Sequence, residues 1–338
     1  MKKLSINDIA QQLNISKTTV SFILNNRAEE KRISAQLVKR VEEFIKEVGY
    51  KPNPIAKSLR TGKTNIIGLM VENIADPFFS AIARHIENKA YKNGYKIIYC
   101  STDNNTEKTK ELLTMFRDRN VDGCIIAPPE GVEAEISDLL ESGMPVVFFD
   151  RHLEGIDTDQ VEVNNYESTY EASRLLIKEG FKEIGFITFS SAQTQMQGRL
   201  EGYKAAMQAA DLNAHILEIK FDQDEALIIG PIAHFLKEHK NMDAVLFSAI
   251  QAGTNGLKAF QQLHIRVPED LAVIAFDDCD LFELYTPSIT AIYQPIDEIA
   301  EATIDLLLNR LKKKTPTGEF KKVIIETGFT LRNSSHRI

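Results

Sequence analysis

The strongest constraint on the fold is an alternation of short apolar runs with longer helical stretches between Ile66 and Phe276. Short apolar runs rich in branched side chains are typical of strands buried on both faces of a sheet. Strands that alternate with helices build parallel sheets with helices on both faces. The predicted strands form two series, 66–71, 96–101, 123–127 and 145–149, then 184–189, 244–248 and 271–276. We therefore expect two similar α/β subdomains.

Charged residues follow two of these predicted strands. Asp150 and Arg151 come after the run 145–149, and Asp277 and Asp278 come after 271–276. Ligands in parallel sheets bind beyond the carboxyl ends of strands, and clefts between domains are favoured sites. The pairs therefore indicate a binding cleft, although they could simply begin the next polar loop.

The first fifty residues predict three helices instead. Ser5 and Asp8 form a capping-box pattern, and Ser16 can cap a second helix from Lys17 to about residue 25. A third helix is expected from about 34 to 48, followed by Gly49 at a position that favours left-handed backbone. Two short helices and a bracing third helix make a helix-turn-helix.

The turn between the first two helices meets the detailed requirements of this motif. Asn14 occupies the position that needs a positive φ, which asparagine tolerates better than a β-branched residue. Ala10 is small where the helices cross, and Ile15 and Val20 can fill the interface beneath. A small three-helix module that binds protein, or that is merely structural, is the alternative interpretation.

Charge separates this segment from the rest of the chain. Residues 1–62 hold 12 Lys and Arg against 6 Asp and Glu, whereas residues 63–338 hold 28 against 42. A basic head on an acidic body suggests that only the head meets a polyanion. Short or cationic side chains at the start of the second helix, Lys17, Thr18 and Thr19, suit contacts with DNA.

Several other classes of protein are not expected. The two N-terminal lysines precede no apolar run, and no apolar stretch is long enough to cross a bilayer, so a cytoplasmic protein is predicted. Three widely spaced cysteines suit neither a disulfide framework nor a zinc site. Because we find no phosphate loop, metal-ligand cluster or nucleophile motif, we expect neither an enzyme nor a bound cofactor or metal.

Residues 8–21 (DIAQQLNISKTTVS) and 50–59 (YKPNPIAKSL) resemble the signature of the LacI/GalR family of repressors. The resemblance implies that residues 51–62 form a hinge helix, which folds when two protomers meet on the operator. Leu59 would then wedge into the minor groove. Pro54 suits a helix N-terminus, and so short a helix is unstable alone. A simple proline-containing linker is the alternative.

The resemblance also implies a set of DNA contacts. Phe22 departs from the polar residue often found at its position, and it could make only an apolar contact or pack inward. The implied DNA-binding residues are Ser5, Ser16, Lys17, Thr18, Thr19, Ser21, Phe22, Asn25, Asn53, Ala56 and Leu59.

The similarity extends through the body, at residues 76–79, 149–151, 198–203, 275–278 and 290–295. It implies effector contacts at Phe78, Phe79, Asp150, Arg151, Arg199, Phe221, Asp277 and Gln294. Carboxylates, a guanidinium, an amide and aromatic rings suit a polyol. Arg151 would favour an acidic sugar or a phosphate unless it is held in a structural ion pair. Ser248 and Ala249 stand where the family usually has a sugar-binding asparagine, which leaves the ligand open.

The expected fold is an all-α helix-turn-helix head (1–50), a hinge and linker (51–62), and a periplasmic-binding-protein-like α/β core (63–338). The core divides into an N-subdomain (about 63–163 and 292–325) and a C-subdomain (about 164–291 and 326–338). We expect a homodimeric repressor of carbohydrate-utilisation genes that binds an inverted-repeat operator and responds to a small sugar-like effector. The alternative is the same DNA-binding role controlled by a protein corepressor or by no small molecule, and a sugar-binding receptor is the rival class.

Overall fold

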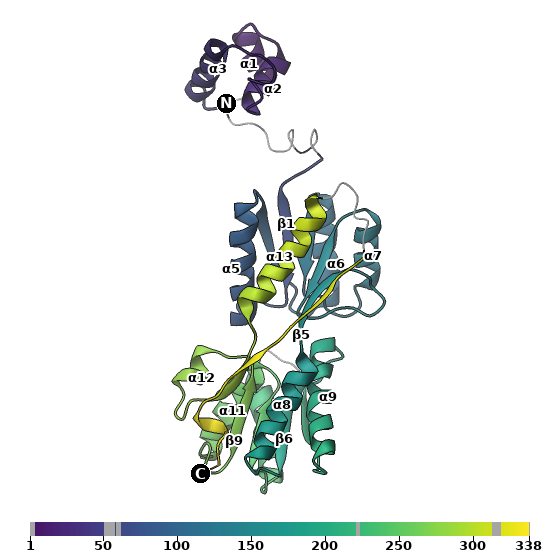
Figure 1. Cartoon of the computed structure of the whole chain (residues 1–338), viewed down its shortest axis with the longest axis vertical. Helices are drawn as coiled ribbons and strands as arrows, with labels where there is room; N and C mark the ends of the chain where they lie inside the picture. Colours follow the sequence, from purple (N-terminus) through teal and green to yellow (C-terminus); the bar gives the residue numbers. More distant parts are fainter. Residues whose placement is uncertain (1–3, 51–57, 59–61, 221–223, 313–318, 338) are drawn as a thin grey trace. The chain divides into compact units, whose positions relative to one another are not determined.

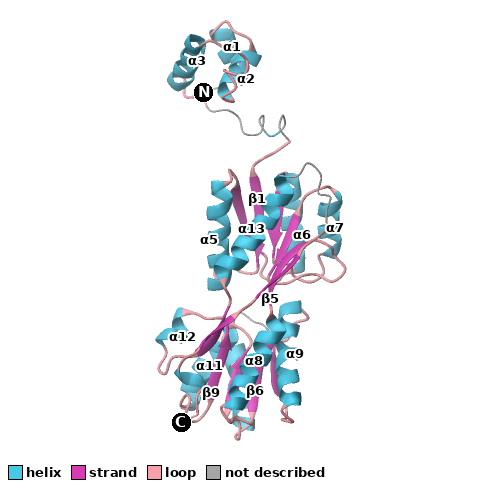
Figure 2. Cartoon of the chain, viewed as in Figure 1, coloured by secondary structure: helices cyan, strands magenta, loops and turns pink. Residues whose placement is uncertain are grey.

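The computed structural model describes residues 4–50, 58, 62–220, 224–312 and 319–337. The chain divides into two compact units, residues 1–64 and residues 65–338, which we call the head and the body. Figure 2 shows that the head is helical, whereas the body combines strands with helices on both faces of its sheets. Among the described residues, no helix is long and apolar enough to span a membrane.

The head contains the three predicted helices, α1 (Ile6–Gln12), α2 (Lys17–Leu24) and α3 (Ala35–Glu47). Each begins where a serine accepts a hydrogen bond from a backbone N–H of the first turn. Ser5 and Asp8 form the complete capping box, with the Ser5 backbone N–H donating to Asp8 Oδ2 at 2.7 Å. Gly49 has a φ of 61°, as its place after the third helix predicts.

The turn between α1 and α2 has the predicted backbone. Asn14 has a φ of 52°, and the backbone N–H of Ile15 donates to the Ala10 carbonyl at 2.9 Å. Beneath this turn lies a small apolar core that all three helices share, formed by Ile9, Ala10, Leu13, Val20, Ile23 and Val41. These contacts fix α2 against its neighbours and leave the start of that helix at the surface.

The body contains two six-stranded sheets with equivalent strand orders, β11-β5-β4-β3-β1-β2 and β12-β10-β9-β8-β6-β7. The first comprises β1 (Ile66–Val71), β2 (Lys96–Ser101), β3 (Gly123–Ile126), β4 (Val146–Phe149), β5 (Asp159–Val163) and β11 (Lys322–Ile325). The second comprises β6 (Ile184–Phe189), β7 (His215–Ile219), β8 (Ala244–Phe247), β9 (Ala272–Phe276), β10 (Thr290–Tyr293) and β12 (Gly328–Thr330). All described pairings are parallel except that of β10 with β12.

Helices cover both faces of each sheet. The N-subdomain contains the first sheet with α5 (Pro77–Lys92), α6 (Thr106–Asp118), α7 (Glu133–Glu141) and α13 (Ile296–Lys312). The C-subdomain contains the second with α8 (Asn165–Lys178), α9 (Thr194–Ala209), α10 (Ala226–Glu238), α11 (Ile250–Leu263), α12 (Asp280–Leu284) and a 3-10 turn at Asn333–Ser335. In Figure 1, α13 lies beside α5 on the first sheet, although in the chain it follows β10 of the second sheet.

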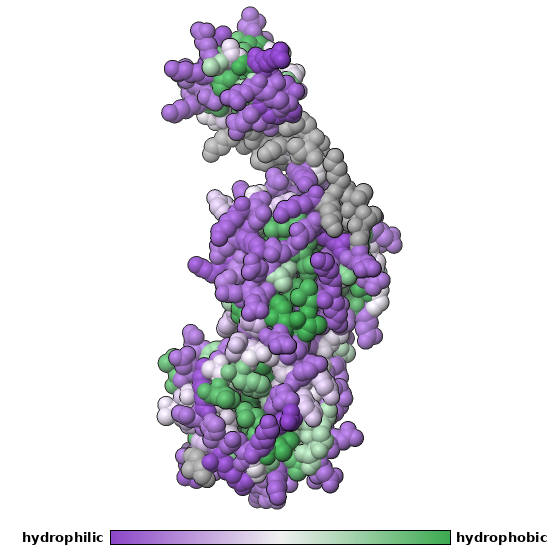
Figure 3. Space-filling model, in the orientation of Figure 1, coloured by the Kyte–Doolittle hydropathy of each residue, from purple (hydrophilic) through white to green (hydrophobic). Residues whose placement is uncertain are grey.

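Apolar layers between sheets and helices hold each subdomain together. The central strands are almost wholly buried, and each sheet packs an apolar cluster on either face. The burial of these side chains is the main favourable contribution to folding. Polar residues cover most of the face of the body that Figure 3 displays.

The chain crosses between the subdomains three times, between β5 and α8, between β10 and α13, and between β11 and β12. The first and third crossings are joined, because Asn164 Oδ1 accepts a hydrogen bond from the Thr327 backbone N–H at 2.9 Å. The predicted boundary at about 292 falls inside β10. Since Thr290–Tyr293 pair with both β9 and β12, the second crossing lies beyond them, at residues 294 and 295.

Candidate functional site

The exposed surface of the head presents the start of α2. Lys17 and Thr18 are exposed, while Thr19 is half-buried and its backbone N–H donates to Ser16 Oγ at 3.0 Å. The hydroxyls of Ser16 and Thr19 also lie 2.8 Å apart, so this capping contact orients both side chains. The helix therefore offers a rigid, polar and cationic N-terminal surface of the size that enters a major groove.

Phe22 lies on this surface and contacts neighbouring cations. Its half-buried ring lies beside two cations, with Arg27 Cζ 5.8 Å and Lys31 Nζ 5.5 Å from the ring centroid. One turn further, Asn25 Nδ2 donates to the Ser21 carbonyl at 2.6 Å. The predicted contacts Asn53, Ala56 and Leu59, and the proposed hinge helix, lie outside the described residues.

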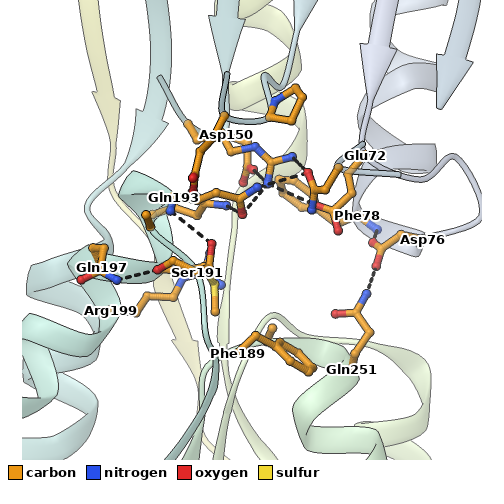
Figure 4. A pocket seen from close by; sticks show the side chains of 18 of the residues that line it. Glu72, Asp76, Phe78, Asp150, Phe189, Ser191, Gln193, Gln197, Arg199 and Gln251 are labelled. Atoms are coloured by element: carbon orange, nitrogen blue, oxygen red, sulfur yellow. Dashed lines mark hydrogen bonds and ion pairs between the residues drawn. The ribbon is translucent and has the colours of Figure 1, made fainter. Parts of the chain in front are cut away.

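The body contains a cavity of about 660 Å³ at the carboxyl ends of the strands of both sheets. Its walls come from the segments that follow β1 and β4 in the N-subdomain and β6, β8 and β9 in the C-subdomain. Figure 4 shows side chains from both subdomains converging on this space. The lining includes Glu72, Asp76, Phe78, Phe79, Asn104, Asp150, Arg151, Phe189, Gln193, Arg199, Ala249, Gln251, Asp277 and Gln294.

Asp150 and Asp277 occupy equivalent places in the two subdomains. Each follows the corresponding strand, β4 or β9, and each has a left-handed backbone, with φ values of 68° and 67°. This conformation turns the chain sharply at the strand end. The sequence prediction that these charged pairs mark a cleft is consistent with the cavity, because both aspartates line it.

The carboxylate of Asp150 has an unusual environment. Its side chain is only 8% exposed, and its nearest cation is Arg151 Nη1 at 3.8 Å. Among the described residues, no group donates a hydrogen bond to this carboxylate. Burial is the main cause of a rise in the pKa of Asp150 to about 6; Arg151 and Arg199 oppose the rise, and Glu72 and Asp277 add to it. Asp150 thus presents to the cavity an acceptor to which no described residue donates a hydrogen bond.

Arg199 and Gln294 surround the second aspartate. Gln294 Nε2 donates to Asp277 Oδ1 at 2.6 Å, and Arg199 Nη1 lies 3.8 Å from Asp277 Oδ2. Arg199 is oriented by hydrogen bonds to Asn165 Oδ1 (2.9 Å) and to the Ser248 carbonyl (2.7 Å), and its Cζ lies 3.6 Å from the centroid of the Phe276 ring. Burial lowers the pKa of Arg199, an effect that Asp277 and Asp150 oppose.

Arg151 forms the structural ion pair that the sequence left as an alternative. Its Nη1 donates to Glu72 Oε2 and to Gln193 Oε1, both at 2.9 Å, and its Nη2 donates to Asn104 Oδ1 at 2.9 Å. The side chain is only 2% exposed. Arg151 lies in the cavity wall, but its terminal nitrogens already have partners in the protein.

Aromatic rings supply the apolar part of the lining. Phe78 and Phe79 lie at the start of α5 with ring centroids 5.1 Å apart, and Phe79 also packs against Phe149 at 6.1 Å. Phe189, at the end of β6, adds a wall that the sequence analysis did not identify. The predicted aromatic contact Phe221 lies outside the described residues.

The sequence analysis also missed the residues that join the two sides of the cavity. Gln251 Nε2 donates to Asp76 Oδ2 at 2.5 Å, and Gln193 Nε2 donates to Asn104 Oδ1 at 3.1 Å. Figure 4 shows Asp76 and Gln251 reaching toward each other from opposite walls. Asp76 carried a local signal as the cap before Pro77, but its distant partner carried none. Gln251 lies two residues beyond Ala249, near the position where the usual asparagine is absent.

The part of the chain that the structure describes holds no group of three or more His, Cys, Asp or Glu side chains arranged to bind a metal ion. The cavity lining consists instead of carboxylates, amides, two guanidinium groups and aromatic rings. Such a set recognises a ligand by hydrogen bonds and by contact with an apolar face.

A helix-turn-helix head on a two-subdomain body with this cavity defines a DNA-binding transcription regulator of the ligand-responsive class. A sequence model of bacterial regulatory proteins of the lacI family matches residues 5–53, and one of periplasmic binding protein-like domains matches residues 174–335. The chain belongs to the lacI family, because the HTH-type transcriptional repressor PurR of Edwardsiella ictaluri is 31% identical over 92% of this chain and 91% of its own length. The resemblance seen in the sequence is thereby confirmed.

Two other similar proteins are informative. The sucrose operon repressor of Pediococcus pentosaceus is 31% identical over 97% of this chain and 99% of its own length. A solved LacI-type regulator of Alkaliphilus metalliredigens, complexed with D-xylulofuranose, is 27% identical with a TM-score of 0.72. That similarity covers 80% of this chain and 98% of the solved one. The expected fold of an α-helical head and a two-subdomain α/β core is confirmed.

Proposed function

We propose that the chain is a dimeric repressor of carbohydrate-utilisation genes whose effector is an uncharged polyol bound in the body cavity. The dimer would bind an inverted-repeat operator in the cytoplasm, with one head in each half-site. The residues that would contact the DNA are Ser5, Ser16, Lys17, Thr18, Thr19, Ser21, Phe22 and Asn25, together with Asn53, Ala56 and Leu59 from the segment that follows α3.

One observation carries the effector proposal. The carboxylate of Asp150 is buried in the cavity wall, and no described residue donates a hydrogen bond to it. A poorly solvated carboxylate that faces a cavity favours a ligand with hydrogen-bond donors, and a hydroxyl pair on a sugar would supply them. Asp277, Arg199 and Gln294 offer further acceptors and donors, and Phe78, Phe79 and Phe189 can cover the apolar face of a sugar ring.

The relatives support this choice of ligand. One curated relative controls a sucrose operon, and a solved neighbour is complexed with a ketopentose. An effector that binds one angle between the subdomains better than another would shift the population of the DNA-competent form. Control by a protein corepressor has no comparable observation in its favour within the described residues.

The experiment is a thermal-shift series on the full chain with neutral sugars, including D-xylulose and sucrose. A true effector raises the melting temperature in a saturable manner by mass action. Asp277→Asn should reduce this response, whereas the control Asp280→Asn, at an exposed site on α12, should retain it. The same sugar should change the affinity of the chain for a DNA site selected from a random pool.

Two results would count against the proposal. The first is a flat response of the unmodified chain to every sugar in the series. The second is an equal response in the Asp277→Asn variant, which would place any binding outside the cavity.

A further inference from the structure

Arg151 lies at a position where a cation could bind an anionic effector. It follows Asp150 directly after β4, lines the cavity and is almost completely buried. A buried guanidinium is the side chain best suited to hold a phosphate or carboxylate, because its donors form a planar fork. The composition of the cavity lining therefore predicts an anion site unless something occupies that fork.

Glu72 occupies it. Its Oε2 accepts a hydrogen bond from Arg151 Nη1 at 2.9 Å, and Gln193 and Asn104 accept the remaining described bonds from the two terminal nitrogens. Arg151 Nε is buried without a partner, but a single nitrogen cannot form the two-pronged contact that an anion prefers. Figure 4 shows Glu72, Gln193 and Asp150 gathered on one side of the cavity.

The charge around the pair also opposes an anion. Six carboxyl residues line the cavity, namely Glu72, Asp76, Glu130, Asp150, Glu218 and Asp277, against two arginines. Burial raises the pKa of Asp76, and the charges of Asp277 and Glu72 raise it further. The charges of Asp277 and Glu72 also raise the pKa of Asp150. The cavity lining therefore carries more acidic groups than its two cations balance.

We infer that Glu72 is a specificity-determining residue, which excludes phosphorylated and other anionic effectors by holding Arg151 in an ion pair. This inference rests on the proposed function, since it concerns the same cavity. Glu72 lies at the end of β1, and its side chain is 21% exposed, so the carboxylate is fixed without being sealed from the cavity. A neutral polyol can donate to these carboxylates, whereas a phosphate group meets their charge.

The test uses sulfate as the probe, because its charge is constant between about pH 5 and about pH 7.5. Glu72→Gln keeps the size of the side chain and removes the carboxylate nearest to Arg151, so that Asp150, at 3.8 Å from Nη1, is the remaining counter-charge. Isothermal titration of the full chain should show sulfate affinity at least about tenfold higher in Glu72→Gln than in the unmodified chain. The sulfate affinity of Glu72→Gln should itself increase as the pH falls toward 5, because protonation of Asp150 removes another nearby negative charge.

Two controls separate this effect from a general change of charge. Glu218→Gln removes one carboxylate from the cavity lining without touching Arg151, and it should give no comparable gain. The double variant Glu72→Gln/Arg151→Met should lose the gain, which excludes binding of sulfate to the basic head. Retained melting behaviour of each variant shows that the fold is intact.

The inference is overturned if Glu72→Gln gains no sulfate affinity, if Glu218→Gln gains as much, or if the double variant keeps the gain. Its failure is distinct from failure of the proposed function. Neutral sugars that bind the unmodified chain, together with no gain in Glu72→Gln, would contradict only the role of Glu72. A sulfate gain in a chain that binds no sugar would contradict only the polyol effector.

Discussion

Asp150 shows how a single side chain can bring binding and stability into conflict. Its pKa is about 6 in the folded chain against an ordinary value of 3.8, mainly because burial disfavours the charged form. The folded chain therefore holds this proton at a pH at which the unfolded chain has lost it. Stability decreases as the pH rises from about 4 to about 6, and the full penalty, on the order of 3 kcal/mol, applies above that range.

Asp150→Asn should remove this penalty and weaken effector binding together. We expect its free energy of unfolding to exceed that of the unmodified chain by up to about 3 kcal/mol at pH 7.5, and to match it near pH 3.5. Urea denaturation at several pH values measures the difference. Asp157→Asn, at an exposed loop position, is the matched control and should leave the pH profile unchanged. Parallel profiles for Asp150→Asn and the unmodified chain would contradict the argument.

At this scale, the sequence predicts what depends on neighbours along the chain. The positive φ of Asn14 and the serine caps follow from local backbone chemistry, and both are confirmed. The positions of Asp150 and Asp277 followed from the rule that parallel strands end at a common edge. The partners Glu72 and Gln251 could not be found in this way. Their contacts join segments about 80 and 175 residues apart, and no local pattern encodes that distance.

Among the elements, α8 and α9 approach each other more closely than ordinary side chains permit. A Cβ atom at Gly202 of α9 would lie 2.3 Å from the Tyr166 carbonyl oxygen of α8. This is a backbone contact, so a rotamer change cannot relieve it. The glycine in the segment 198–203 is therefore required by helix packing, and the adjacent Tyr203 fixes α9 to the sheet by donating to the Ile184 carbonyl at 2.7 Å.

Gly202→Ala should therefore destabilise the body. Forcing the two helices apart costs about 1–3 kcal/mol or more, which outweighs the gain of about 1 kcal/mol in helix propensity. Gly230→Ala in α10 is the comparison, because nothing beyond its chain neighbours lies within 4 Å of its Cβ position, although the following Pro231 offsets part of the propensity gain. Chemical denaturation should show a loss of stability in Gly202→Ala that clearly exceeds any change in Gly230→Ala. Equal stability of Gly202→Ala and the unmodified chain would show that the helices can move apart freely.

Most of the strands that the sequence predicts well are uniformly buried, and the edge strand β2 is the exception. All seven strands expected from apolar runs are present, with ends that differ by at most one residue. The strands it missed include β5, β7 and β11, which carry polar residues because they lie at or near sheet edges. In β5 the polar residues are buried in specific pairs, as with Asp159, whose Oδ2 accepts from Arg310 Nε at 2.7 Å. Periodicity alone does not predict such pairs.

Considered as a whole, the body is two similar halves that three chain crossings join and a few polar contacts hold together. The crossings constrain the subdomains to rotate about a common region. The hydrogen bonds of Gln251 with Asp76 and of Gln193 with Asn104 lie on the cavity side and link the halves directly. These contacts favour the angle seen here, and an effector must compete with them or add to them.

Gln251→Leu should shift the body toward a more open arrangement. The amide of Gln251 donates to the Asp76 carboxyl group, and such a hydrogen bond contributes about 1.5 kcal/mol, the value at which the ranges for neutral and charged partners meet. Its loss should reduce the ratio of closed to open forms about tenfold, and the affinity for any effector that binds the closed form should fall by up to the same factor. Gln261→Leu, exposed near the end of the same helix, makes the same chemical change as a control.

Distances between spin labels carried by non-natural amino acids at exposed positions 91 and 281 would report the angle, since α5 and α12 belong to different subdomains. We expect a broader and longer distance distribution in Gln251→Leu than in Gln261→Leu, and a return toward the unmodified distribution when the effector is added. An unchanged distribution would mean that the three crossings alone set the angle. The cavity-side contacts would then follow the closure of the body instead of stabilising it, and effector binding would have to act through the crossings themselves.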